Sequence, residues 1–314
     1  MHRLLILSRF ARDYRALIES AHLADLTIAS ASDPADIGGA AEFDLAFGEP
    51  ALLRQAMPAL DRVRWIQSTW AGVEPLLDPA LRRDYILTNA RGVFGAQMSE
   101  YVFAYLLAHE RKIFDKQAAQ QAGRWDPTPP SRLRGRQLGL LGVGTIGAAL
   151  ACTAKHFGMR VKGYTRASED SPDVDEYFHG ALHDAGARFA SDLDYLVSVM
   201  PATADTRHLV DDRLLRALPP RALFVNPGRG GVVDETALAA ALQEGRIAGA
   251  VLDVFETEPL PADHIFWRLP NVRITSHTAA LSAPADIAPI FIDNYRRLLH
   301  GEPLLYRVDF ERGY

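Results

Sequence analysis

The stretch Gln137-Leu-Gly-Leu-Leu-Gly-Val-Gly-Thr-Ile-Gly147 decides how the rest of the chain is interpreted. It opens with an apolar run typical of a β-strand, and an alanine-rich helical stretch, 148–157, follows it. Gly142, Gly144 and Gly147 have the spacing G-x-G-x-x-G, which permits a tight turn, a close approach of backbone to pyrophosphate, and packing of helix on strand. Such glycines also mark ordinary turns, so the flanking strand and helix carry the interpretation. Together they predict a dinucleotide-binding turn at a helix amino terminus.

The composition is that of a globular protein. The chain has 314 residues, of which 48% are hydrophobic and 23% charged, enough for two domains. The net charge is −5 and the arginines are scattered, so no affinity for nucleic acid is expected. No apolar run reaches membrane-spanning length, and the apolar run within Met1–Leu7 is too short for a signal peptide. The single cysteine, Cys152, excludes an intramolecular disulfide and is expected to be buried in its apolar helix. We therefore expect a cytoplasmic protein that binds no membrane.

The remainder of the chain alternates strand-like and helix-like segments. The first group of expected strands comprises Arg3–Ser8, Leu26–Ala29, Phe43–Phe47, Val63–Gln67 and Ile86–Thr88. The group after the glycine turn comprises Arg160–Thr165, Tyr195–Val199, Ala222–Asn226, Ile247–Leu252 and Val272–Thr275. The longest helical pattern runs from Gln97 to Ala122. Repeated strand–helix units predict parallel sheets with helices on both faces, and hence an α/β protein with two doubly wound parallel-sheet domains.

Three ionisable residues follow strands of the second expected sheet. Arg229 comes after the strand 222–226, Glu258 after the next strand, and His277 after the last. Ligands of open α/β sheets bind beyond the carboxyl ends of the strands. Each residue alone is explained as a polar loop residue, but their shared placement is not. A cation, a carboxylate and an imidazole on the same edge as the glycine turn predict a redox site.

Several motifs resemble those of the D-isomer-specific 2-hydroxyacid dehydrogenase family, and in particular its glyoxylate/hydroxypyruvate reductase-like members. They are the glycine stretch and the segments Val225–Glu235, Leu252–Leu260 and Leu269–His277. The N-terminal part matches only in pattern and at Ala71-Gly-Val73. The resemblance implies a Rossmann cofactor domain, residues 97–284, inserted in a flavodoxin-like substrate domain, residues 1–96 and 285–314. It also implies a homodimer.

The resemblance assigns catalytic roles to the three ionisable residues. Arg229 would bind the carboxylate and carbonyl of a 2-oxo acid through its planar guanidinium. His277 would protonate the ketone oxygen as hydride arrives, and Glu258 would favour its imidazolium form. The loop with Ala71-Gly-Val73, which follows an expected strand, would hold the substrate carboxylate by its main-chain N–H groups. Taken by itself, the same sequence is explained as an ordinary turn between a strand and a helix. The expected substrate-binding residues are Trp70, Ala71, Gly72, Val73 and Arg229.

The end of the strand after the glycine turn departs from the pattern of NAD-binding members. Those end with an acid for the ribose 2′-hydroxyl, whereas here Thr165 stands there with Arg166 and Ser168 beside it. A cation with no carboxylate before Glu169 favours NADP(H) over NAD(H), unless Arg166 is only an exposed turn residue. Asp253 matches a position associated with the nicotinamide carboxamide, and capping of its own loop is the alternative. The expected cofactor-binding residues are Gly142, Gly144, Thr145, Ile146, Gly147, Thr165, Arg166, Ser168, Pro201 and Asp253.

The leading hypothesis is NADPH-dependent reduction of a small 2-oxo acid, such as glyoxylate or hydroxypyruvate, to the D-2-hydroxy acid. The alternatives are an NAD-linked dehydrogenase of another D-2-hydroxy acid and a dinucleotide-sensing interaction protein on the same fold. His179 and His183 are four residues apart, but Gly180 intervenes and no third ligand is evident, so no metal site is expected. The expected partners are the small acid and a second copy of the chain.

Overall fold

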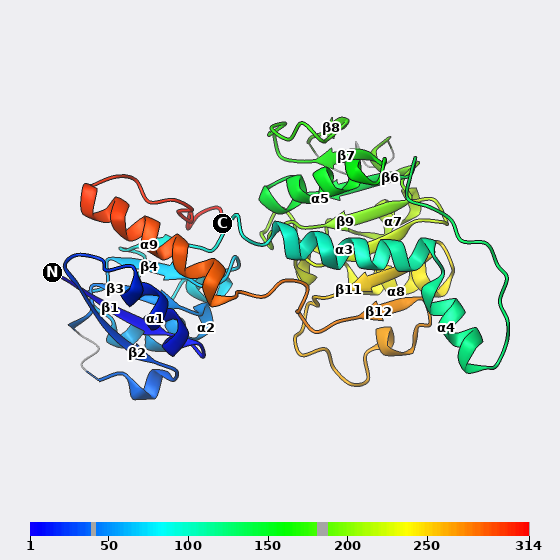
Figure 1. Ribbon diagram of the computed structural model, residues 1–314. Helices are drawn as coiled ribbons and strands as arrows, with labels where there is room; N and C mark the ends of the chain where they lie inside the picture. Colours follow the sequence, from blue (N-terminus) through cyan, green and yellow to red (C-terminus); the bar gives the residue numbers. More distant parts are fainter. Residues whose placement is uncertain (39–41, 181–187, 314) are drawn as a thin grey trace. The chain divides into compact units, whose positions relative to one another are not determined.

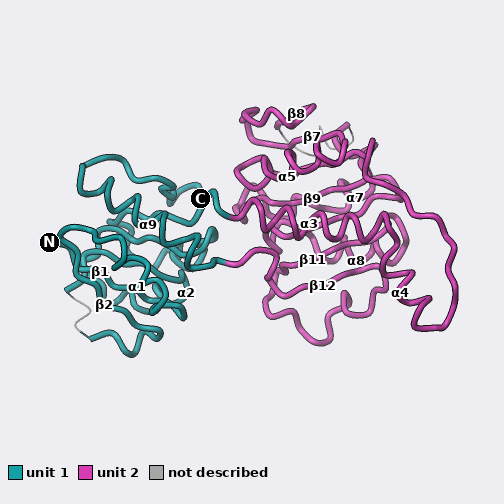
Figure 2. Tube along the Cα trace, viewed as in Figure 1, with its two compact units in different colours: residues 1–93, 282–314 teal, residues 94–281 magenta. Residues whose placement is uncertain are grey.

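The protein divides into two compact units. The computed structural model describes residues 1–38, 42–180 and 188–313. Unit 1 consists of Met1–Val93 and Ser282–Tyr314, and unit 2 consists of Phe94–Leu281 (Figure 2). The domain junctions expected from the sequence were 96/97 and 284/285. Unit 2 is therefore continuous in sequence, whereas unit 1 is assembled from two separate segments.

Unit 1 is built on a five-stranded sheet in the order β2-β1-β3-β4-β5, with every pair parallel (Figure 1). Its strands are β1 (His2–Leu7), β2 (Leu26–Ala31), β3 (Leu45–Gly48), β4 (Trp65–Ser68) and β5 (Ile86–Thr88). Its helices are α1 (Ala11–Ser20), α2 (Pro50–Ala56) and α9 (Pro284–His300), with 3₁₀ turns η1 (Pro34–Asp36), η3 (Met57–Ala59) and η4 (Glu74–Leu77). This strand order is the flavodoxin-like one.

Helix α9 completes the core of unit 1 although it is far from the strands in sequence. The ring of Phe291 stacks on Trp65 at a centroid distance of 5.1 Å and lies 5.2 Å from the ring of Phe47. The Asn294 side chain donates a hydrogen bond of 3.1 Å to Gln67 Oε1. All five side chains are buried. The face of the sheet that carries Phe47 and Trp65 therefore depends on α9 for its apolar partner.

Unit 2 is built on a seven-stranded sheet in the order β12-β11-β10-β9-β6-β7-β8, again with every pair parallel. Its strands are β6 (Gln137–Leu141), β7 (Arg160–Tyr164), β8 (Glu176–Phe178), β9 (Tyr195–Ser198), β10 (Leu223–Asn226), β11 (Gly249–Leu252) and β12 (Val272–Ile274). Its helices are α3 (Gly95–Glu110), α4 (Ile113–Gln121), α5 (Thr145–His156), α7 (Asp212–Ala217) and α8 (Glu235–Gln243), with 3₁₀ turns η5 (Gly230–Val232) and η6 (Ile265–Arg268). The strand order reverses between β6 and β9, as in the Rossmann fold. The expected fold class is confirmed.

Two local expectations were wrong, and one strand was not predicted. The single helix expected over 97–122 is two helices, because Lys112 between α3 and α4 has a φ of 53°. The short edge strand β8 was not expected at all. Cys152 is exposed rather than buried. On α5 the buried face contains Leu150, Ala151 and Ala154, and Cys152 lies on the opposite face of the helix.

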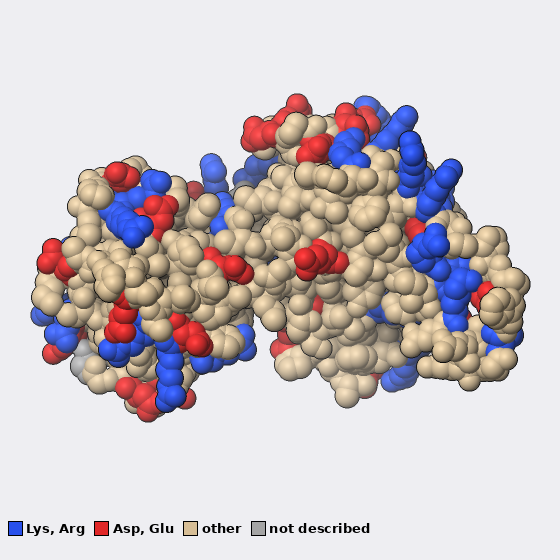
Figure 3. Space-filling view, in the orientation of Figure 1, with Lys and Arg blue, Asp and Glu red and all other residues tan. Residues whose placement is uncertain are grey.

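A loop that we call the arm, residues 123–136, joins α4 to β6. Its Trp125 is 91% exposed, and the ammonium group of Lys116 ties the arm to α4 by hydrogen bonds to the carbonyls of Asp126 and Thr128. On the face shown in Figure 3, basic side chains gather on the side of unit 2 along which the arm runs. Among the described helices, none combines the length and the apolar character that a membrane crossing requires.

Candidate active site

The turn after β6 has the geometry of a phosphate cradle. Gly142 has a φ of 95°, in the left-handed region that favours glycine. A Cβ atom on Gly147 would lie 2.2 Å from the carbonyl oxygen of Gly142, so α5 approaches the turn too closely for any side chain. Around Gly144, by contrast, nothing lies within 4 Å of the Cβ position. Thr145, which is exposed, and Ile146 begin α5, so the open backbone and the helix amino terminus fit a pyrophosphate group.

The end of β7 carries the residues expected at a 2′-phosphate. Thr165 is buried and its hydroxyl donates a 2.7 Å hydrogen bond to the carbonyl oxygen of Ser168. Arg166 is exposed, and its Nη2 lies 2.9 Å from Oδ2 of Asp205 in the loop that follows β9. The expected residue Pro201 lies in the same loop, shortly after the end of β9. Asp205 was not expected, because it is 39 residues from its partner and no local pattern marks it.

His179 lies beside the same strand end. Its Nδ1 is 3.1 Å from the carbonyl oxygen of Thr165, and its Nε2 is 2.7 Å from Oε1 of Glu169. The hydrogen bond to Glu169 raises the pKa of His179 above its ordinary value. Its expected neighbour His183 lies outside the described residues. The residues that the structure describes contain no cluster of histidine, cysteine or carboxylate side chains that could hold a metal ion.

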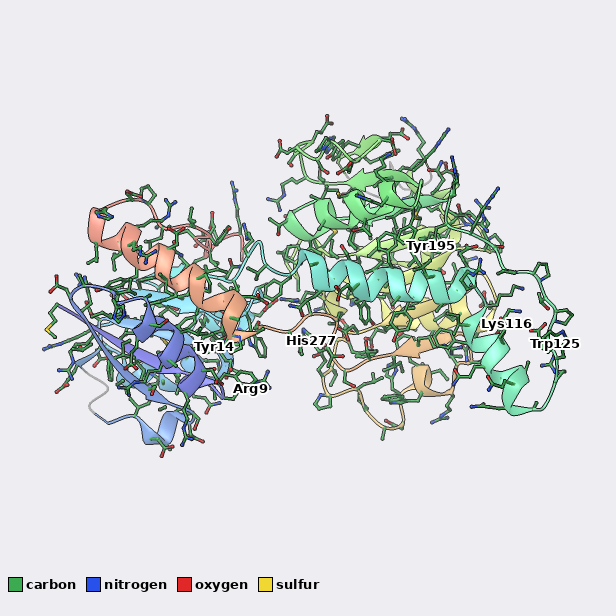
Figure 4. The ribbon with its side chains drawn as sticks, viewed as in Figure 1. Arg9, Tyr14, Lys116, Trp125, Tyr195 and His277 are labelled. Atoms are coloured by element: carbon green, nitrogen blue, oxygen red, sulfur yellow. The ribbon has the colours of Figure 1, made fainter. Side chains whose placement is uncertain are left out.

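A histidine–carboxylate pair lies at the carboxyl edge of the same sheet. Nδ1 of His277 lies 2.8 Å from Oε2 of Glu258, while the other oxygen of Glu258 accepts a 3.0 Å hydrogen bond from the amide of Phe255. Both side chains are partly exposed. Figure 4 shows His277 on the segment that follows β12, at the end of unit 2 opposite to Trp125. The pair therefore reaches solvent at the edge where ligands of such sheets bind.

The contact between His277 and Glu258 favours the charged form of both side chains. The hydrogen bond to Glu258 raises the pKa of His277, while partial burial and the charge of Arg229 act in the opposite direction. Partial burial alone would raise the pKa of Glu258. The hydrogen bonds from His277 and Phe255, together with the positive charges of His277 and Arg229, hold that pKa below its ordinary value.

Arg229 lies in the loop after β10 and is half-buried. Its Nη1 donates a 2.8 Å hydrogen bond to the carbonyl of Gly228, and its own carbonyl accepts one of 3.0 Å from the Asn226 side chain. A Cβ atom on Gly230 would lie 1.9 Å from the carbonyl carbon of Phe255, so this loop packs directly on the loop that leads to Glu258. The structure thus brings the three expected ionisable residues to one edge.

The carboxylate of Asp253 is buried and is occupied within the loop that carries His277. Its Oδ1 accepts hydrogen bonds from the hydroxyl of Thr275 at 2.5 Å and the amide of Thr278 at 2.8 Å, and its Oδ2 accepts one from the amide of Ala279 at 2.9 Å. The main-chain oxygen of Asp253 accepts the N–H of His277 at 2.8 Å. This geometry is the loop-capping role that the sequence left as an alternative to a nicotinamide contact.

A second unexpected contact reaches the same loop from helix α3. The hydroxyl of Tyr101 lies 2.7 Å from the hydroxyl of Thr275, across 174 residues of sequence. Tyr101 lies within the helical pattern expected from Gln97 to Ala122, and no role at the site was expected for it. Only a prediction of three-dimensional contacts would have found it, because neither residue belongs to a motif with the other.

The expected substrate-binding loop follows β4 in unit 1. Ser68 holds it, since its hydroxyl accepts the Trp70 amide and donates to the Trp70 carbonyl, both at 2.9 Å. Within the part of the chain that the structure describes, the amides of Ala71, Gly72 and Val73 donate no hydrogen bond. These three main-chain donors are therefore not used within this part of the chain.

Sequence comparison identifies the family. The profile of the D-isomer specific 2-hydroxyacid dehydrogenase NAD binding domain matches residues 103–279. Glyoxylate/hydroxypyruvate reductase A of Klebsiella pneumoniae subsp. pneumoniae is 34% identical over 220 residues, which cover 70% of each chain.

Solved structures agree with the sequence comparison. A D-isomer specific 2-hydroxyacid dehydrogenase family protein from Aeromonas salmonicida has a TM-score of 0.93 and 41% identity, covering 98% of this chain and 99% of that chain. A D-isomer specific 2-hydroxyacid dehydrogenase from Xanthobacter autotrophicus, in complex with NADPH and MES, has a TM-score of 0.89 and 33% identity, covering 100% and 99%. This chain therefore belongs to the D-isomer specific 2-hydroxyacid dehydrogenase family and is an NAD(P)-dependent oxidoreductase.

Proposed function

We propose that this chain reduces a small 2-oxo acid of the glyoxylate or hydroxypyruvate type to the D-2-hydroxy acid, with NADPH as reductant. The observation that carries the proposal is the His277–Glu258 pair with Arg229, on the sheet whose β6 leads into the glycine turn. The Klebsiella relative, a glyoxylate/hydroxypyruvate reductase A, and the NADPH complex of the Xanthobacter structure support the substrate class and the cofactor.

The side chains of the site supply the proton and the binding groups for this reaction. NADPH, when bound, supplies the hydride. His277 binds Glu258 through Nδ1, so Nε2 carries the proton that passes to the ketone oxygen. Glu258 keeps the ring oriented and stabilises the imidazolium before transfer. Arg229 binds the 2-oxo acid through the two-point geometry of its guanidinium and draws electron density from the carbonyl.

The preference for NADPH rests on the residues at the end of β7. In the proposal the turn of Gly142 and Gly147 holds the pyrophosphate, and Thr165, Arg166 and Ser168 lie at the 2′-phosphate. Arg166 is paired with Asp205, but both side chains are more than half exposed. An exposed ion pair contributes about 0–1 kcal/mol, whereas a hydrogen bond to a charged group contributes about 1.5–3 kcal/mol. A 2′-phosphate therefore displaces Asp205 from Arg166.

The proposal also assigns roles to the two units. Unit 2 is the cofactor domain, in which Pro201 and Asp253 lie near the nicotinamide half of the cofactor. Unit 1 is the substrate domain, in which Ala71, Gly72 and Val73, with Trp70, provide main-chain donors for the substrate carboxylate. A cytoplasmic location is part of the proposal, supported by a single cysteine that cannot form an intramolecular disulfide.

We further propose that the protein is a homodimer that forms through the arm. The arm extends from unit 2 with Trp125 91% exposed, and a tryptophan buries about 150–250 Å² when it is covered. A second copy of the chain would supply that cover. Light scattering of the wild type should give twice the monomer mass, and Trp125→Ala should shift the mass toward the monomer. A monomeric wild type at micromolar concentration would contradict the dimer.

A substrate panel tests the catalytic proposal. NADPH and NADH oxidation would be followed with glyoxylate, hydroxypyruvate and larger 2-oxo acids, with His277→Ala as the inactive control. We expect reduction of the small acids, with a higher kcat/KM for NADPH than for NADH. A protein that binds NADPH in calorimetry but reduces no 2-oxo acid would instead be a dinucleotide sensor. Preference for NADH would contradict the cofactor assignment alone.

A further inference from the structure

A chain of hydrogen bonds runs from helix α3 to the loop that carries the proton donor. The Tyr101 hydroxyl is 2.7 Å from Thr275 Oγ1, which is 2.5 Å from Oδ1 of Asp253. The threonine hydroxyl has one proton, and the carboxylate can only accept it. Thr275 therefore donates to Asp253, and Tyr101 donates to Thr275. The direction of both hydrogen bonds is therefore fixed by the chemistry of the carboxylate.

The end point of this chain holds the backbone around His277. Asp253 accepts the amides of Thr278 and Ala279 through its carboxylate and the amide of His277 through its main-chain oxygen. His277 itself has a φ of 57°, a region that residues other than glycine rarely adopt. Such a conformation persists where surrounding contacts over-determine it. The contacts that do so here come from Asp253, whose orientation depends on Thr275.

We infer that Tyr101 and Thr275 are positioning residues for proton transfer, because they orient the carboxylate of Asp253 that holds the turn of His277 against Glu258. The inference rests on the proposed function, in which His277 is the proton donor. Tyr101 remains a neutral donor throughout the working range, because burial raises its pKa. Loss of the hydrogen bonds that link Tyr101, Thr275 and Asp253 would loosen the His277–Glu258 contact.

The consequence is a specific change in catalysis. The charged groups that act on His277 are Glu258, Arg229 and Asp253, and the hydrogen bond to Glu258 is what raises its pKa. A looser turn weakens that bond, so the imidazolium loses its proton at a lower pH. Both hydroxyls are occupied, Tyr101 by Thr275 and Thr275 by Asp253, so the proposed function gives neither of them a contact with substrate or cofactor and the Michaelis constants should change little.

Two substitutions at position 275 separate the effect of the hydroxyl from the effect of the side-chain shape. Thr275→Val keeps the shape and removes the hydrogen bonds, whereas Thr275→Ser keeps the hydroxyl. We expect Thr275→Val to lower kcat for glyoxylate reduction about tenfold, with KM for glyoxylate and NADPH within about twofold of wild type. The upper limb of its pH profile should begin at a lower pH. Thr275→Ser should keep the wild-type pH profile.

Substitutions on helix α3 repeat the test away from the loop. Tyr101→Phe should change kcat and the pH profile in the same direction as Thr275→Val. The matched control is Tyr105→Phe, one helical turn further on, because the Tyr105 hydroxyl makes no hydrogen bond within the described part of the chain. Tyr105→Phe should behave as wild type. A cooperative thermal unfolding transition shows that each variant is folded. If Thr275→Val does not fold, Tyr101→Phe alone tests the inference.

The outcomes distinguish this inference from the proposed function. A wild-type kcat and pH profile in Tyr101→Phe and Thr275→Val would overturn the inference, as would equal losses in Thr275→Val and Thr275→Ser. A wild type that reduces no 2-oxo acid, or an active His277→Ala, would overturn the proposed function itself. Loss in Tyr101→Phe and Thr275→Val, with activity kept in the two conservative controls, supports both.

Discussion

Nδ1 of His277 lies 2.8 Å from Oε2 of Glu258, which leaves Nε2 of the same ring available to a substrate oxygen. Each residue shifts the ionisation of the other, because the carboxylate raises the pKa of His277 and the imidazolium helps to lower that of Glu258. His277, the proposed proton donor, is therefore kept charged to a higher pH than an isolated imidazole would be. This relationship sets the direction of the pH dependence of the enzyme.

Removal of the imidazole should abolish most of the proton-transfer step. We expect His277→Ala to lower the turnover number for 2-oxo acid reduction by about 10²–10⁴, because general acid catalysis contributes that much. NADPH binding, measured by fluorescence titration, should be retained, since the glycine turn after β6 is intact. Near-wild-type turnover in this variant would exclude His277 as the proton donor.

Neutralisation of the carboxylate should narrow the pH range of reduction. In the proposed mechanism reduction requires the imidazolium, so its rate should fall as the pH rises through the pKa of His277. Glu258→Gln removes the negative charge that raises this pKa, so the fall should begin at a lower pH than in wild type. The measurement is kcat/KM against pH. Glu256→Gln is the control, because Glu256 pairs with His208 rather than with His277.

Loss of the guanidinium at the end of β7 should affect one cofactor only. We expect Arg166→Ala to raise KM for NADPH about tenfold or more, since a charge-assisted contact to a phosphate is lost, and to leave KM for NADH nearly unchanged. Asp205→Asn should have the opposite sign for NADPH, because it removes the carboxylate that competes for Arg166. Equal effects of Arg166→Ala on both cofactors would show that Arg166 does not contact the 2′-phosphate.

In the proposed function a lysine should not replace Arg229. Arg229→Lys keeps the charge but loses the planar fork, so kcat should fall and KM for the 2-oxo acid should rise together. Steady-state kinetics with glyoxylate measure both constants. Arg221→Lys provides a comparison at the other end of β10, where the arginine pairs with Asp194 and activity should be unchanged. A fall in kcat with constant KM would assign Arg229 to the transition state alone.

The fold class and the common edge of the three ionisable residues were predictable because they depend on local patterns. Glycines at 142, 144 and 147 mark a turn with few alternatives, and buried parallel strands are apolar along their whole length. Arg229, Glu258 and His277 each follow such a strand, so their common edge follows from the sheet topology alone. The prediction needed only the correct order of the elements.

The features that were missed depend on tertiary contacts or on rare backbone conformations. Lys112 is a good helix former, yet its left-handed φ separates α3 from α4, and nothing in its side chain indicates this. The pairs Arg166–Asp205 and Tyr101–Thr275 join residues that are remote in sequence. The burial of Cys152 was predicted from composition, whereas its exposure depends on the rotational phase of α5.

Unit 1 is assembled from two segments that are separated in sequence by the whole of unit 2, and this limits the order in which a growing chain can fold. Strands β1–β5 are synthesised before any part of unit 2, but the helix that covers Trp65 and Phe47 with Phe291 is synthesised after all of it. Unit 2 is contiguous, so we expect it to become protease-resistant on the ribosome while the first segment of unit 1 is still cleavable. In chains stalled after residue 281 has emerged, limited proteolysis should therefore cut within 1–93 and spare 94–281. Resistance of both segments would mean that β1–β5 form a stable layer without α9.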